Sequence, residues 1–160
     1  MDLTQISYNI DLAKLDNTRW LEYADALIHG NTINKDGIPK YREECIPCQW
    51  LYDHSDEVSR FYKKIDKAEV EFFDFDIMEQ IEVLRYDLHE KYLFIFKTYL
   101  PDMNHSIFAF LFRSNRRRTE YDHIAAKRQF REMKRIVEEL NKKLEQLELS
   151  LNKMCQLNIA

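Results

Sequence analysis

The sequence predicts an all-α protein, a four-helix bundle followed by a long C-terminal coiled-coil helix. The first observation is compositional: the 160 residues include only 2 glycines and 3 prolines, with 45% hydrophobic and 32% charged residues. Such a chain favours long helices over turns and strands. The second observation is a heptad pattern, in which apolar residues alternate at spacings of three and four near the C-terminus. We call these residues the heptad seam: Phe130, Met133, Val137, Leu140, Leu144, Leu147, Leu151 and Met154.

The first helix is expected over residues 3–29. Apolar residues recur there on one helical face, and Gly30 follows as a C-terminal stop signal. Residues 30–44 are rich in Gly, Asn and Pro and predict a loop. A short helix is expected after this loop, with Pro47 in its first turn.

Residues 57–73 and 75–100 are expected to form two helices or one bent helix. Ser55 or Asp56 can cap the start of this region, and the next proline, Pro101, ends it. The helix that carries the heptad seam is then expected to start near Arg118 and to run to about Leu157.

The chain divides, in this interpretation, into a helical bundle at 1–112 and a basic linker with its coiled-coil helix at 113–160. A stripe of period 3.5 on a helix of 3.6 residues per turn must be covered by another helix. The upstream helices are sufficient to close a core of their own. We therefore expect a homodimer through the heptad seam, with parallel helices favoured. The alternative is a bundle helix whose stripe is covered by its own chain.

The net charge of −4 hides a polarised distribution. Residues 53–90 contain twelve acidic residues against five basic ones, whereas 113–143 contain eleven basic against five acidic. Such segments are expected to be neighbours in the fold or across a dimer. A basic patch, which offers charge for phosphate groups, comprises Arg113, Arg116, Arg117 and Arg118. The acidic half opposes polyanions, which disfavours nucleic acid as the partner.

Cysteine usage and hydropathy predict a cytoplasmic protein. Three cysteines, an odd number, in a chain without a signal peptide indicate a reducing compartment. The longest apolar tracts, 92–100 and 107–112, are bounded or interrupted by charged residues and Pro101, so we expect no membrane span.

Catalytic motifs are missing from the sequence, and we expect no enzymatic activity. Two glycines cannot build a phosphate-binding loop, and no Ser-His-Asp arrangement is suggested. Cys45 and Cys48 form a Cys-x-x-Cys pair. It is interpreted as half of a metal site completed by His54 or His29, as a redox pair at a helix start, or as a buried structural pair. We expect no resident cofactor, with zinc as the alternative.

The first half of the chain resembles the chemoreceptor zinc-binding (CZB) domain family of bacterial chemoreceptors and diguanylate cyclases. That family has His three residues before Trp on its first helix and Cys-x-x-Gly-x-Trp after a loop. Here Trp20, Cys45 and Trp50 keep the pattern, while Asn17 replaces the His and Cys48 replaces the Gly. The resemblance covers residues 8–100.

The resemblance implies a CZB-like bundle that has lost most of the family's zinc ligands. The family's His-x-x-x-His would fall at Glu69 and Phe73, or in a looser placement at Arg85 and His89. A zinc site takes about four nitrogen or sulfur donors, and the amide of Asn17 is a poor ligand. The two tryptophans are then expected to be core anchors.

These observations together predict a non-enzymatic bacterial regulatory or adaptor protein of signal transduction. It would dimerise and dock or relay to a protein partner through its coiled coil or through the apolar patch Phe108–Phe112. One alternative is a zinc or redox sensor using Cys45 and Cys48. A second is a nucleic-acid-associated coiled-coil protein using the basic patch.

The zinc content of the purified protein distinguishes the zinc-sensor hypothesis from the adaptor hypothesis. We expect protein purified from zinc-replete medium under reducing conditions to hold far less than one zinc per chain by elemental analysis, because the donor set is incomplete. A content close to one zinc, lost in Cys45→Ser while the fold survives, would contradict this expectation and favour the sensor.

Overall fold

The computed structural model describes residues 3–31, 46–60, 77–99 and 120–158. All secondary structure in these ranges is helical, which confirms the all-α class. Residues 55–60 are helical and follow α2 directly. The four longer elements are α1 (Leu3–His29), α2 (Ile46–Asp53), α4 (Ile77–Tyr99) and α6 (Glu120–Asn158). Among the described residues, no helix is long and apolar enough to cross a membrane.

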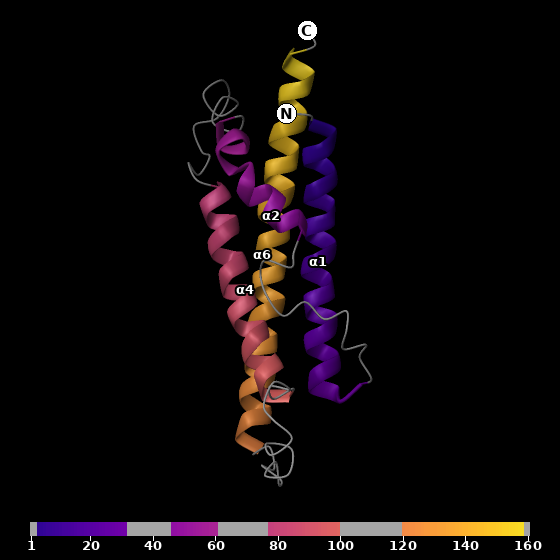
Figure 1. Cartoon of the computed structure of the whole chain (residues 1–160), viewed down its shortest axis with the longest axis vertical. Helices are drawn as coiled ribbons and strands as arrows, with labels where there is room; N and C mark the ends of the chain where they lie inside the picture. The colour runs from indigo at the N-terminus through magenta and orange to yellow at the C-terminus, as the bar shows by residue number, and fades with distance from the viewer. Residues whose placement is uncertain (1–2, 32–45, 61–76, 100–119, 159–160) are drawn as a thin grey trace, which may run out of the picture.

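The three long helices α1, α4 and α6 lie side by side, as Figure 1 shows. α6 runs antiparallel to both α1 and α4 and packs against each of them. The short helix α2 packs on α1 and crosses it obliquely. The fold is therefore a bundle in which the C-terminal helix is one of the members.

The end of α1 is set by Gly30, as the sequence predicts. Gly30 has a φ of 70°, a left-handed conformation that costs glycine little. The backbone N–H of Asn31 donates to the carbonyl of Ala26, and that of Gly30 donates to the carbonyl of Leu27. This pair of hydrogen bonds is the Schellman motif, which satisfies carbonyls that the helix end leaves open.

The heptad seam lies in the core of the same chain, which corrects the expectation of a second copy covering it. From Phe130 to Leu151 every seam residue is buried; the side chain of Met154 lies outside the described residues. The seam belongs to one apolar cluster with α1 and α4, which includes Ile6, Ile10, Leu88, Tyr92 and Ile95. The upstream helices do not close a core of their own, because α6 completes it.

Polar contacts set the register between α1 and α6. The Nδ2 of Asn17 donates to Oδ1 of Asn141 at 3.0 Å, and Asn17 is buried. Nearer the N-terminus, Glu148 accepts from the hydroxyl of Ser7 at 2.6 Å and from Nζ of Lys14 at 2.8 Å. These contacts pair early residues of α1 with late residues of α6, as the antiparallel arrangement requires.

The ion pair between Lys14 and Glu148 shifts both pKa values in the direction that favours charge. Burial by itself would lower the pKa of Lys14, but its hydrogen bond to Glu148 and the charges nearby outweigh burial and raise it. Burial would raise the pKa of Glu148, but hydrogen bonds from Lys14 and Ser7 outweigh it and lower the pKa. Both side chains are about a fifth exposed, so solvent weakens the pair.

The first prediction concerns core packing in α6. Leu147 is fully buried, whereas Leu149 on the same helix is 62% exposed. We expect Leu147→Ala to lower the free energy of unfolding by about 2–5 kcal/mol, because it leaves a cavity in the core. Leu149→Ala is the matched control and should change it by less than about 1 kcal/mol. Urea unfolding followed by circular dichroism measures both, and equal losses would contradict the buried seam.

The second prediction concerns pH. Because the pKa of Glu148 is lower in the folded chain, its contribution to stability is present above the ordinary carboxyl range and is lost as pH falls through the folded pKa. The raised pKa of Lys14 makes its contribution disappear only in alkali. We expect Glu148→Gln to be less stable than the parent near neutral pH, with the difference shrinking in acid. A difference that stays constant in acid would contradict the ion pair.

Candidate ligand pocket

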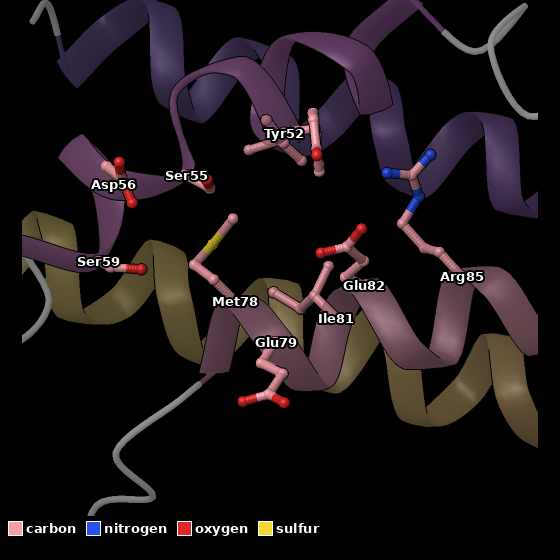
Figure 2. Close-up of a pocket in the computed structure, with 10 residues that line it drawn as sticks. Tyr52, Ser55, Asp56, Ser59, Met78, Glu79, Ile81, Glu82 and Arg85 are labelled. Atoms are coloured by element: carbon pink, nitrogen blue, oxygen red, sulfur yellow. The ribbon is translucent and has the colours of Figure 1, made fainter.

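A cavity of about 310 Å³ lies where α2 and residues 55–60 face the first turns of α4 (Figure 2). This volume is in the range of small-molecule sites. Its apolar wall is made by Leu51, Met78 and Ile81, which are all buried. Leu51 reaches the cavity from α2, and the other two reach it from α4.

Backbone hydrogen bonds and one buried side chain fix the position of the residues that line the pocket from α2 and from 55–60. The backbone N–H of His54 donates to the carbonyl of Trp50, and that of Val58 donates to the carbonyl of His54, so helical bonding continues across the turn at His54. Val58 is fully buried and anchors residues 55–60 in the core. Tyr52, Ser55, Asp56 and Ser59 consequently share one helical face, the one that lines the cavity.

The polar lining combines hydroxyl groups with an excess of carboxylates. Tyr52, Ser55 and Ser59 supply the hydroxyls. Asp56, Glu79 and Glu82 supply three carboxylates against the single guanidinium of Arg85. In Figure 2 the side chains of Tyr52 and Glu82 point into the space between the helices, while that of Glu79 points away from it. The cavity therefore has an apolar wall and a negatively charged rim.

His54, expected as a weak metal ligand, takes part in the end of α2. Its Nδ1 lies 2.9 Å from the carbonyl oxygen of Trp50, and the two rings stack with centroids 4.4 Å apart. Cys45 and the side chain of Cys48 lie outside the described residues. In the ranges that the structure describes, no group of three or more His, Cys, Asp or Glu residues is arranged to hold a metal ion.

Trp20 is a core anchor, as predicted. It is buried, and its ring centroid lies 5.4 Å from that of His89 and 5.1 Å from that of Tyr92. Trp50 is partly buried and packs against the same core. His89, one of the looser His-x-x-x-His positions, therefore lies against Trp20 on α1, whereas Arg85 lines the pocket.

The remaining predicted sites lie outside the described residues. They are the basic patch at Arg113 and 116–118 and the apolar patch at 108–112. Sequence analysis did not single out the pocket. The only signal available was the recurrence of polar side chains at 52, 55, 56 and 59, on one face of a helix, and of charged side chains at 79, 82 and 85 on a later helix.

Comparisons with protein families, curated proteins and solved structures found no match to this chain. The CZB resemblance therefore stays a prediction.

Proposed function

We propose that the protein is a non-enzymatic regulatory bundle that binds a small organic cation in the pocket between α2 and α4. The observation that supports this proposal is the lining itself, in which the carboxylates of Asp56 and Glu82 outnumber the guanidinium of Arg85 beside an apolar wall. Carboxylates favour an ammonium group through charge-assisted hydrogen bonds, and the apolar wall favours a short carbon chain. A primary amine with a short aliphatic part combines both properties.

The position of the pocket gives ligand binding a way to act on the rest of the bundle. One wall belongs to α4, which packs along α6, and the other belongs to the segment that packs on α1 through α2. A ligand between these walls fixes the position of α2 relative to α4. Packed helices move as units, so a shift of α4 is transmitted to α6 and to any partner that docks there.

The side chains around the pocket suit binding better than catalysis. The imidazole of His54, between Tyr52 and Ser55 in the chain, has its Nδ1 hydrogen-bonded within its own helix and stacks on Trp50. His54 is not among the residues that line the cavity, so within the described residues the lining holds no imidazole as the base that a serine or tyrosine nucleophile requires. This supports the regulatory interpretation of the pocket.

The third prediction tests the charge preference of the pocket. We expect n-butylammonium to shift the backbone amide signals of Leu51 and Ile81 in NMR titrations, and n-butyrate, with a similar chain and the opposite charge, to leave them unchanged. Glu82→Gln should weaken binding by about tenfold or more, because a hydrogen bond to a charged group contributes roughly 1.5–3 kcal/mol.

Glu57→Gln is the matched control, because Glu57 is exposed on the same segment as Asp56 and does not line the cavity. It should leave the affinity unchanged. Equal binding of butyrate, or equal weakening by both substitutions, would rule out a cation site at this position.

A further inference from the structure

We propose that the compound bound between α2 and α4 is a free α-amino acid with an apolar side chain. This inference rests on the proposed function, because it names the class of molecule whose ammonium group the pocket takes. It adds a role for Arg85, the cation among the described residues that line the cavity. Arg85 holds the carboxylate that an α-amino acid carries on the same carbon as its ammonium group.

Opposite charges lie side by side at one end of the pocket. Glu82 and Arg85 are three residues apart on α4 and are therefore neighbours on one face of the helix. In Figure 2 both side chains lie toward the end of the cavity that Tyr52 lines, whereas Asp56 lies toward the other end. An α-amino acid presents two opposite charges at a similarly short separation. Its ammonium group can then contact Glu82 while its carboxylate contacts Arg85.

The position of Arg85 suits the recognition of a carboxylate. Its side chain is partly buried in the wall of the cavity, whereas Glu82 is exposed at the rim. A guanidinium offers five N–H donors in a planar fork, so it can serve a ligand carboxylate and an acceptor of the protein together. The bond to the carboxylate is charge-assisted and is strengthened where water is partly excluded.

The apolar wall and the volume of the cavity select the side chain of the ligand. Leu51, Met78 and Ile81 are 2%, 8% and 2% exposed and together form that wall. An aliphatic side chain buries its apolar surface against them. The volume of about 310 Å³ is at the lower limit of small-molecule sites, which suits an amino acid better than a nucleotide or a larger cofactor.

The charge of the pocket favours a carboxylate that is paired with an ammonium group over other anions. Asp56 and Glu82 outnumber Arg85, so a simple carboxylate or a phosphate meets net repulsion. An α-amino acid is neutral overall near neutral pH, and its ammonium group offsets the negative rim. An amine that lacks the carboxylate also satisfies the rim but gains nothing from Arg85.

The experiment compares L-leucine with two compounds that each lack one of its charged groups. Isopentylammonium lacks the carboxylate, and isocaproate lacks the ammonium group. NMR titrations follow the backbone amide signals of Leu51 and Ile81. We expect leucine to bind about tenfold or more tightly than isopentylammonium, because a hydrogen bond between charged groups is added. Isocaproate should leave the signals unchanged.

Arg85→Gln tests the role of the guanidinium. It should reduce the affinity for leucine to that for isopentylammonium, whose own affinity is kept or increased because a nearby positive charge is lost. Arg60→Gln is the matched control, since Arg60 is exposed on the segment at 55–60 and does not line the cavity. It removes the same charge and should keep the preference for leucine. Far-UV circular dichroism verifies that both variants are folded.

The outcomes separate this inference from the proposed function. Binding of isopentylammonium without a preference for leucine would overturn the amino-acid inference and leave the cation site in place. Absence of binding by both leucine and isopentylammonium would remove the cation site as well. If Arg85→Gln weakened both compounds equally, Arg85 would maintain the shape of the pocket and would not hold the carboxylate. Isocaproate that binds as tightly as leucine would replace the inference by a simple anion site.

Discussion

The burial of the α6 heptad seam by α1 and α4 is the constraint on which the rest of the structure depends. Seam residues such as Met133, Leu140 and Leu147 are fully enclosed, and the apolar faces of α1 and α4 meet them from two sides. Burial of apolar area is the main source of stability in a bundle of this kind. Once the seam points inward, the opposite side of α6 must face solvent, which is why Arg128, Arg131 and Arg135 are exposed.

Apolar packing alone leaves the sliding position of two helices poorly defined, because one heptad of a regular seam is similar to the next. The polar contacts between α1 and α6 remove this ambiguity. The hydrogen bond between the buried Asn17 amide and Asn141, and the cluster of Glu148 with Ser7 and Lys14, are satisfied at one register. A slip by one heptad would leave the Asn17 amide buried without its partner, which costs more than the pair itself contributes. Asn17 thus serves helix alignment.

The proposed ligand site depends on α4. The inner face of α4 contributes to the core, and its first turns form one wall of the pocket. A ligand in the pocket would therefore act on a helix that also packs against α6. Transmission of binding to α6 would require only that α4 has two packing positions of similar free energy.

The sequence by itself determined the helical class, the end of α1 at Gly30, the extent of α6 and the burial of Trp20. These depend on local signals, namely composition, a left-handed C-terminal residue and apolar periodicity. It could not determine which helices cover the heptad seam, because apolar burial is non-directional and a stripe of leucines fits its own chain as well as a second copy. The pocket and the role of Asn17 were equally hidden, since each is made by residues far apart in the chain. Only the tertiary structure, by placing α4 beside α2 and Asn17 beside Asn141, decided them.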